Sequence, residues 1–350
     1  MSPARERRWR PQQLRLLRVD AARAVRDDAT LAELPRLLSP GDLLVVNDAA
    51  TLPASLRGHD ESGAEIELRL LAEDEDGDWS AALLGAGDWR TRTENRPLPP
   101  SVVAGAALRF GKLRARVLEL SPLSPRLLRL RFEARGDALW RALYRLGRPI
   151  QYSHLARDLE LWEAQTAYAG RPWAVEAPSA GLGLTPGLIL ELRRAGVGVR
   201  SLTHAAGVSA TGDPAIDAAL PLPERFEIPE STASAVRAAR AARGRVVAVG
   251  TSVVRALETA AADGGGLSAT AGISRLRIGP AHRLRAVDGL LTGVHEPGTS
   301  HHELLQAFLP RPALDAALAQ AEASGYLGHE FGDLLLLLPE RDARAPVRAA

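Results

Sequence analysis

The chain has 350 residues, of which 46% are hydrophobic and none is cysteine, and its formal net charge at pH 7 is +2. This length can bury a sizeable core and predicts about two domains, while the lack of cysteine excludes disulfides, thiolate metal sites and cysteine nucleophiles. Because the sequence shows neither an apolar run near ~18 residues nor a signal-peptide pattern, we expect a soluble, cytoplasmic protein without membrane contact, and the small charge gives little electrostatic support for an RNA partner.

The first segments of the chain carry strand, cap and charge signals. Leu14–Asp20 has the composition of a strand, and Thr30 and Glu33 have the spacing of a capping box before a short helix at Leu34–Leu38. The basic run Arg5–Arg10 has two interpretations, a solvated terminus or a contact for an RNA backbone, and the solvated terminus is favoured.

A second, fully apolar strand is predicted at Leu43–Val46 and ends at Asn47 and Asp48. Polar side chains just past a strand end either face a ligand or cap the turn. The local pattern favours the turn.

Between residues 56 and 135 the sequence changes to short segments that alternate apolar and polar side chains, with no helix between them. This pattern predicts a small antiparallel sheet or barrel inserted into an α/β chain. The acidic run Glu73–Asp78 is interpreted as a solvated hairpin tip rather than a metal loop. The expected domains are 56–135 for the insertion, and 1–55 together with 136–350 for the α/β part. The predicted strands of the insertion are Glu65–Ala72, Trp79–Leu84, Arg114–Leu120 and Leu127–Phe132.

Helices and strands alternate after the insertion, which predicts a mixed or mainly parallel sheet, open or barrel-like. Thr185 can cap a helix that has Pro186 in its first position. The stretch Pro172–Pro186 is too apolar for an exposed linker, and its small residues allow close approach to a ligand or to another strand. Thr203–Gly207 is the expected exit loop of a strand. Helices are predicted at Asp137–Leu146, Leu155–Tyr168, Leu188–Arg194, Ser231–Ala242 and Pro312–Ser324, and strands at Val197–Leu202, Gly272–Ile278, Leu284–Asp288 and Asp333–Leu338.

The stretch Arg245–Ala262 reads as a buried strand, a glycine and a helix. Gly250 breaks the strand, and Thr251 or Ser252 can cap the helix that follows. Such a turn presents unpaired backbone N–H groups and a positive dipole end, which suit a carboxylate, a phosphate or a ribose hydroxyl. An ordinary β-α corner is the alternative.

Histidines and acidic residues gather between residues 295 and 303. They match no standard zinc spacing, because the adjacent His301 and His302 point to different faces of a helix. We therefore predict no metal site here, and interpret Ser300 and Glu303 as a capping box for a helix at Leu304–Leu309.

Several separated segments together resemble the S-adenosylmethionine:tRNA ribosyltransferase-isomerase family of queuosine biosynthesis. The resemblance runs from about residue 14 to residue 338, and the family's fold, an α/β domain with an inserted small β domain, agrees with the pattern above. The segments that carry it are Leu38–Asp48 (LSPGDLLVVND), Gln165–Pro186 (QTAYAGRPWAVEAPSAGLGLTP), Arg245–Glu258 (RVVAVGTSVVRALE), Val287–Pro297 (VDGLLTGVHEP) and Gly332–Asp333.

The resemblance implies an unusual use of S-adenosylmethionine. An aminomethyl group on a 7-deazaguanine in tRNA attacks the ribosyl carbon, adenine and methionine leave, and the ribose rearranges to an epoxycyclopentanediol. This chemistry requires a base, donors for the departing adenine and tight positioning of the sulfonium. The resemblance implies no metal and no redox cofactor, with S-adenosylmethionine and tRNA as partners, and we expect a monomer.

The sequence departs from the family pattern at polar positions. The histidine of the family loop Pro-Thr-Ala-Gly-Leu-His-Phe-Thr has become Gly183, and the Thr-Arg after the family's Asn-Asp has become Ala49-Ala50. Of the family's Leu-His-Val-Gly-Leu-Gly-Thr-Phe loop only the histidine remains, as His204. The family's His-Arg-Met-His segment falls on about Ala219–Leu222, which carries no group that can exchange a proton.

Three readings follow from these departures. The chain catalyses the family reaction, with His204, His295 and the carboxylate of Asp48 or Glu176 in the vacant roles. Alternatively it is a divergent paralogue that binds S-adenosylmethionine and acts on a small-molecule acceptor or cleaves the cofactor, or it is a non-catalytic binding protein.

The candidate residues are the same for each reading. Arg255 and Glu258 are also spaced for an i,i+3 ion pair on one helix. The candidate catalytic residues are His204, His295 and Asp48, and the candidate substrate-binding residues are Asn47, Gln165, Tyr168, Ser179, Gly181, Thr185, Gly250, Thr251, Ser252, Arg255 and Glu258.

Overall fold

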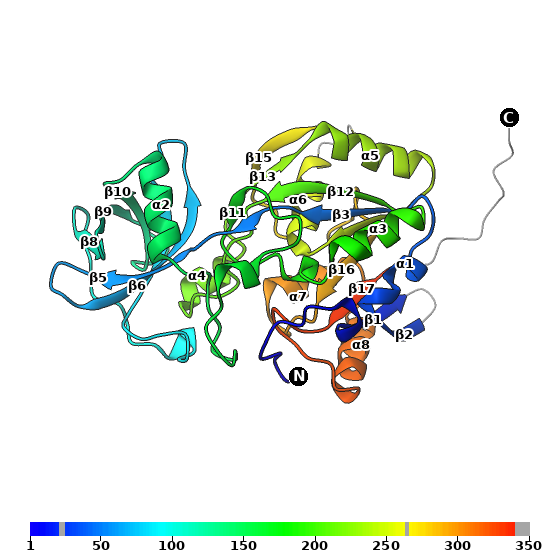
Figure 1. The fold of residues 1–350 in the computed structure, drawn as a ribbon, viewed down its shortest axis with the longest axis horizontal. Coiled ribbons are helices and arrows are strands. Elements are labelled where there is room, and N and C mark those ends of the chain that lie inside the picture. Colours follow the sequence, from blue (N-terminus) through cyan, green and yellow to red (C-terminus); the bar gives the residue numbers. More distant parts are fainter. Residues whose placement is uncertain (21–24, 263–265, 340–350) are drawn as a thin grey trace, which may run out of the picture.

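The computed structural model describes residues 1–20, 25–262 and 266–339. These residues form two bodies, a large sheet with helices on both faces and a small closed barrel at the opposite end of the molecule (Figure 1). The last part of the predicted α/β domain, 340–350, lies outside the described residues. Within the described ranges, no helix has both the length and the apolar content needed to cross a bilayer.

The large sheet has nine strands in the order β15-β13-β12-β3-β14-β16-β17-β1-β2. Its four central strands, β12, β3, β14 and β16, run parallel, so their carboxyl ends share one edge. Antiparallel pairs on both sides make the sheet mixed, which confirms the predicted fold class. The strands are β1 Arg15–Asp20, β2 Val25–Thr30, β3 Leu43–Asn47, β12 Gly198–His204, β13 Glu224–Ile228, β14 Val246–Val249, β15 Thr270–Ser274, β16 Gly289–Gly293 and β17 Leu334–Leu337.

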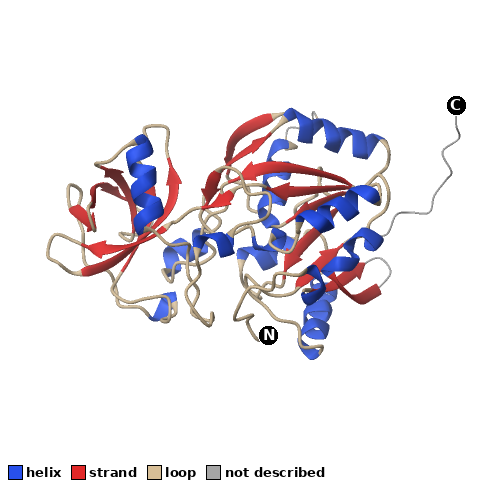
Figure 2. Cartoon of the chain, viewed as in Figure 1, coloured by secondary structure: helices blue, strands red, loops and turns tan. Residues whose placement is uncertain are grey.

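Helices cover both faces of this sheet because its central strands are apolar on both sides (Figure 2). In β3, Leu43 and Val45 pack into one core cluster and Leu44 and Val46 into the other, as the alternation of side chains along a strand requires. The first cluster includes residues of α5 Glu230–Ala241, α6 Thr251–Ala260, α7 Ser300–Leu305 and α8 Arg311–Ala323, and the second includes residues of α1 Leu34–Leu37 and α3 Pro186–Arg194.

The barrel closes six antiparallel strands in the order β10-β7-β6-β5-β8-β9. All six lie between Ser55 and Phe132, close to the predicted 56–135 insertion, whose domain bounds remain a prediction. Trp79 on the barrel contacts Trp140 of the covering helix edge to face, with ring centroids 6.1 Å apart. The elements are β5 Ser55–His59, β6 Glu65–Glu73, β7 Trp79–Leu84, β8 Ala107–Phe110, β9 Leu113–Leu120, β10 Leu127–Phe132 and the covering helix α2 Gly136–Leu146, while α4 Pro214–Ala219 and the pair β4 Ala50–Thr51 and β11 Pro172–Ala174 lie outside both sheets.

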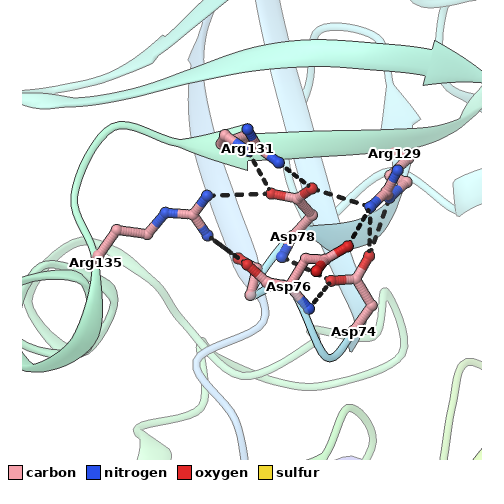
Figure 3. Close-up of polar contacts among 7 residues, drawn as sticks. Asp74, Asp76, Asp78, Arg129, Arg131 and Arg135 are labelled. Carbon is pink, nitrogen blue, oxygen red and sulfur yellow. Dashed lines mark hydrogen bonds and ion pairs between the residues drawn. The ribbon is translucent and has the colours of Figure 1, made fainter.

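The acidic run Glu73–Asp78 is held by arginines, so its interpretation as a solvated tip is wrong for its last residue. Asp78 is fully buried and pairs with Arg129 at 3.0 Å, Arg131 at 2.7 Å and Arg135 at 3.3 Å (Figure 3). The hydrogen bond from Arg131 contributes most to lowering the pKa of this carboxyl. The turn is therefore a charge-paired anchor between barrel strands.

Two helix-start predictions are confirmed. Thr185 accepts a hydrogen bond from the backbone N–H of Leu188 at the start of α3, and the helix begins with Pro186. The backbone N–H of Thr30 donates to the Glu33 carboxylate at 2.8 Å, as a capping box requires, although the turn it caps is a 3-10 turn before α1.

Two other predictions are wrong, and a third holds only in part, because the groups involved bond to residues far away in the sequence. The segment Leu155–Tyr168 is not a helix apart from a 3-10 turn at Leu161–Ala164. Its backbone bonds instead to the amino-terminal run, where the guanidinium of Arg7 donates to the carbonyl of Gln165. Arg8 in the same run pairs with the buried Asp333 at 2.7 Å, so the run is anchored to the fold at Arg7 and Arg8. The solvated character predicted for the run holds for its other four residues, Arg5, Glu6, Trp9 and Arg10, which are exposed.

The predicted strand at Leu284–Asp288 is also not formed, and the strand at this place is β16, beginning at Gly289. The backbone N–H groups of Arg285, Ala286 and Val287 donate to the carboxylate of Glu258 at 2.9 to 3.1 Å. One buried side chain on α6 thus replaces the hydrogen bonds that a neighbouring strand would have made.

Candidate active site

A cavity of about 450 Å³ lies at the edge where the parallel strands of the large sheet end. The turns after β14 and β16 form one side of it, and residues of the barrel and its loops, including Arg69 and Thr93, form another. Ligands in open α/β sheets bind at this edge, because loops from different strands converge there. The two bodies of the molecule therefore meet around one candidate site.

The turn after β14 is built on Gly250, whose φ of +88° is a conformation that favours glycine. Gly250 itself occupies the N-cap position of α6, so the prediction that Thr251 or Ser252 caps the helix is wrong. All three residues line the cavity, and the positive end of α6 lies beside it. This is the arrangement expected for holding a ribose hydroxyl or a carboxylate.

Asn47 joins this turn to the neighbouring strand. Its side-chain oxygen accepts the backbone N–H of His204, and its amide nitrogen donates to the backbone carbonyl of His204, both at 2.9 Å. The same amide lies 3.4 Å from the hydroxyl of Ser252. Asn47 is buried, so it positions the cavity wall from behind.

His204 is the last residue of β12 rather than part of an exit loop, and it is completely buried. Neither ring nitrogen has a hydrogen-bond partner among the residues that the structure describes, although Nε2 lies 3.5 Å from Oε2 of Glu224. Burial, with a contribution from Arg255, lowers the pKa of His204 to about 3. The imidazole is therefore neutral at pH 7.

Arg255 pairs with Glu224 across the cavity wall, and both residues line the cavity. The predicted ion pair between Arg255 and Glu258 is wrong, since Glu258 instead accepts backbone N–H groups and contacts His282 at 3.2 Å. Burial lowers the pKa of Arg255 to about 10, which leaves the guanidinium charged at pH 7. Arg255 and Glu224 together place a fixed, balanced charge pair beside the turn that begins α6.

Glu176 is the acidic residue of the cavity whose properties best suit a base. Burial, and then the negative charge of Glu330, raise the pKa of Glu176 to about 7. Ser209 partly opposes this, because its backbone N–H and its hydroxyl donate to Oε1 of Glu176 at 3.1 and 3.2 Å. A carboxyl near half ionisation at neutral pH is matched to proton transfer.

His295 also lines the cavity and lies against a second histidine. Its Nε2 is 2.8 Å from the hydroxyl of Thr292, and its ring centroid is 4.9 Å from that of His301. Burial, and then the two neighbouring histidines, lower the pKa of His295. The predicted capping box at Ser300 is wrong, because Thr299 is the N-cap of α7 and accepts the N–H of His302.

Five other predicted residues lie outside the cavity lining and have partners of their own. Asp48 accepts the hydroxyl of Thr203 at 2.6 Å, and Gln165 pairs through both its amide atoms with the backbone of Thr51 at 2.9 Å. The hydroxyl of Tyr168 donates to the carbonyl of Gly181 at 3.3 Å, and a Cβ at Gly181 would overlap this hydroxyl. The fifth residue, Thr185, is the N-cap of α3. Of the predicted residues, those that line the cavity are Glu176, Ser179, Gly250, Thr251, Ser252, Arg255 and His295.

The sequence reasoning missed a group of cavity residues from two distant segments. His154 follows the barrel, whereas His329 and Glu330 lie just before β17. Each offers one ligand atom, and the three atoms lie within 4.8 Å of one another. The nearest signal was the Gly332–Asp333 motif, which marks the segment without indicating its partner.

Gly183, where the resembling family has a histidine, is packed against leucines. A Cβ at this position would overlap Leu14 and lie 2.5 Å from Leu31. The position belongs to the core around α1 and α3 and does not line the cavity.

Comparison with known proteins covers almost the whole chain. Residues 2–337 match the family described as queuosine biosynthesis protein. The chain is 37% identical over 310 residues to an S-adenosylmethionine:tRNA ribosyltransferase-isomerase from Thermus thermophilus, covering 87% of each chain. It is 38% identical to the protein of that name from Thermosynechococcus vestitus, over 88% of this chain and 84% of the relative. The fold is similar to a crystal structure of an S-adenosylmethionine tRNA ribosyltransferase from Thermotoga maritima, with a TM-score of 0.52, 25% identity and 95% coverage of both chains.

Proposed function

Since the chain belongs to the queuosine biosynthesis protein family, we propose that it is an S-adenosylmethionine:tRNA ribosyltransferase-isomerase. It transfers and isomerises the ribosyl group of S-adenosylmethionine onto a 7-aminomethyl-7-deazaguanine in tRNA. The observation that supports this most is the cavity at the carboxyl edge of the parallel strands, lined by the Gly250 turn, which is among the segments that resemble the family. Because the acceptor is a tRNA, we place the reaction in the cytoplasm, and we expect a monomer to be sufficient.

In this proposal the Gly250–Ser252 turn holds the ribose hydroxyls or the carboxylate of S-adenosylmethionine. Ser179 and the pair of Arg255 with Glu224 contact the same substrate from the adjacent walls. The carboxylates of the cavity complement the positive sulfonium and, when protonated, the acceptor amine.

Glu176 takes the proton that the acceptor nitrogen loses as it bonds to the ribosyl carbon. Adenine and methionine are the leaving groups. His295, held neutral by its surroundings, hydrogen-bonds to the substrate rather than donating a proton as an imidazolium.

The other candidate residues have positioning roles in this proposal. Asn47 fixes the backbone of His204 and thereby the wall that carries Ser252. The remaining members of this supporting set are Asp48, Gln165, Tyr168, Gly181, Thr185, His204 and Glu258.

The test is incubation with S-adenosylmethionine, with and without tRNA bearing the deazaguanine, followed by mass spectrometry of the nucleoside and of free adenine. Adenine release that requires the tRNA, together with an epoxycyclopentanediol on the deazaguanine, supports the proposal. Absence of both products from folded protein that binds S-adenosylmethionine by calorimetry contradicts it.

The packing of Gly183 favours a second candidate function. The family histidine has no room at this position, and the stretch Ala219–Leu222 offers no replacement, so another acceptor is the alternative. In that case the protein is a paralogue that cleaves S-adenosylmethionine or transfers its ribosyl group to a small molecule. Adenine release without tRNA distinguishes this candidate from the first, and no release in either arm favours a binding protein.

A further inference from the structure

Two histidines and a glutamate converge on one wall of the cavity, and all three are far from the Gly250 turn in the sequence. Nε2 of His154 lies 3.3 Å from Oε2 of Glu330, and the ring centroids of His154 and His329 are 4.5 Å apart. Single ligand atoms from the three residues all lie within 4.8 Å of one another. The fold therefore brings together three groups that the sequence separates by about half its length.

Two of the three residues in this cluster have a buried polar atom without a hydrogen-bond partner. Nε2 of His154 and Oε2 of Glu330 are both inaccessible to solvent, and neither forms a hydrogen bond within the described part of the chain. Buried polar atoms are normally satisfied, so an unsatisfied pair that faces a cavity calls for a ligand. A cation satisfies both lone pairs at once.

The backbone that presents His329 is both unusual and tightly held. His329 has a φ of +66°, a left-handed conformation that non-glycine residues rarely adopt. The turn is fixed because Asp333 accepts the N–H of Leu327 at 2.8 Å and the N–H of Gly332 donates to the carbonyl of His329 at 2.9 Å. A strained residue on a rigid turn beside a cavity is typical of functional sites.

We propose that His154, His329 and Glu330 bind one divalent transition-metal ion whose remaining coordination positions open into the cavity. Two imidazoles and one carboxylate form the ligand set of open zinc sites and also suit iron, cobalt and manganese. Bonds of about 2.1 Å in tetrahedral geometry place ligand atoms about 3.4 Å apart. The 3.3 Å between the His154 and Glu330 atoms is close to this value, and the His329 atom, which lies within 4.8 Å of both, has to approach them when an ion binds.

The surroundings of the cluster fit a metal centre. Oε1 of Glu296 lies 3.3 Å from Nε2 of His329. In the proposed site the ion therefore takes Nδ1 of His329, and Glu296 orients the ring through Nε2. The ring of Tyr152 stacks on His154 with centroids 5.7 Å apart.

This site concerns residues other than the histidines at 295–303, for which the sequence predicts no metal. It also goes beyond the proposed function, because metal binding needs neither S-adenosylmethionine nor tRNA. The two proposals therefore fail independently.

The experiment uses the full chain after chelator treatment and dialysis. Zn²⁺ is titrated by calorimetry, and Co²⁺ is added separately to record its visible ligand-field bands. We expect one equivalent of either ion per chain and bands of a four- or five-coordinate centre with nitrogen and oxygen ligands.

The variants are His329→Asn, chosen because asparagine tolerates the left-handed backbone, and Glu330→Gln, which conserves shape. Each should weaken Zn²⁺ binding by at least the roughly 10- to 100-fold that loss of an outer-shell partner costs. His59→Ala removes a barrel histidine outside this cavity, so this control variant should leave the affinity unchanged.

Circular dichroism and thermal unfolding without metal verify that each variant is folded. The proposal is overturned if Zn²⁺ fails to bind at about 100 μM, which means a binding free energy weaker than roughly 5.5 kcal/mol. It is also overturned if the folded variants His329→Asn and Glu330→Gln bind Zn²⁺ as well as the parent chain does. It is equally overturned if the affinity is lost only in His59→Ala.

Discussion

Glu176 should act as the base of the reaction, and Glu176→Gln tests this with little disturbance of the cavity. The amide oxygen of glutamine can still accept the two hydrogen bonds from Ser209, so the loop geometry should be retained. What the substitution removes is the group that gains and loses a proton. Loss of one positioned acid or base costs roughly 10²- to 10⁴-fold in rate, and we expect kcat to fall within this range.

The pH dependence of kcat gives a more precise expected change for the same role of Glu176. With its pKa at about 7, the Glu176 carboxyl is about one-eleventh ionised at pH 6 and about ten-elevenths ionised at pH 8. Because a base must be ionised to accept a proton, kcat should rise about tenfold between these values. The rise should be missing in Glu176→Gln.

The substitution Ser209→Ala should move the midpoint of this pH profile to higher pH. The hydrogen bonds from Ser209 favour the charged carboxylate and lower its pKa. Removing the hydroxyl should therefore shift the midpoint of the profile above that of the parent chain. The exposed Glu191 on α3 supplies the matched control, and Glu191→Gln should leave the profile unchanged.

The assay is adenine release from S-adenosylmethionine in the presence of deazaguanine-bearing tRNA, measured under saturating substrate from about pH 5.5 to 9. The reasoning is refuted if Glu176→Gln keeps the parent rate and profile. A rate that falls with rising pH through 7 also refutes it, since that slope belongs to a general acid.

Three further substitutions test other parts of the structure. Glu67→Gln should destabilise the fold by about 3–5 kcal/mol in urea unfolding near pH 7, because it leaves the buried Arg69 and Arg96 without their partner, whereas the exposed Glu65→Gln should have little effect. Burial disfavours the Glu67 carboxylate, but the two arginines outweigh burial and lower the pKa of Glu67 to about 2 from the unfolded 4.5. The stability that this carboxylate contributes is therefore complete above pH 4.5 and is lost as the pH falls toward 2. An unfolding profile in acid that is identical in Glu67→Gln would contradict this. Gly183→His, which restores the family residue, should lower stability by about 1–3 kcal/mol or more because Leu14 and Leu31 fill the space, and an unchanged melting temperature would show that the packing yields easily. Gly250→Ala should cost about 1–3 kcal/mol through its positive φ and should weaken calorimetric binding of S-adenosylmethionine, while tight binding by the folded variant would remove the α6 turn from the proposed site.

Local patterns in the sequence were sufficient for the elements whose formation depends on neighbouring residues. The apolar runs at β3 and β14, the strands β7 and β10 within their predicted bounds and the Thr185-Pro186 start of α3 are all present as predicted. In each case the hydrogen bonds lie within the element or to adjacent strands of matching pattern.

Only the tertiary structure decided which groups would partner across long separations. Glu258 has the spacing of a helical ion pair, yet its carboxylate holds a loop 27 to 29 residues away, and that loop gives up a predicted strand. The same is true of the raised pKa of Glu176, which depends on burial and on Glu330.

The cluster of His154, His329 and Glu330 shows the same limit of prediction from the sequence. The sequence determined the family, the mixed sheet with its inserted barrel and the turn beside the cavity, because repeated local patterns specify them. It could not indicate that His154 would meet His329 and Glu330, since their approach depends on the packing of the barrel against the sheet. Chemistry at such a site is set by distances between side chains, and these exist only in the folded chain.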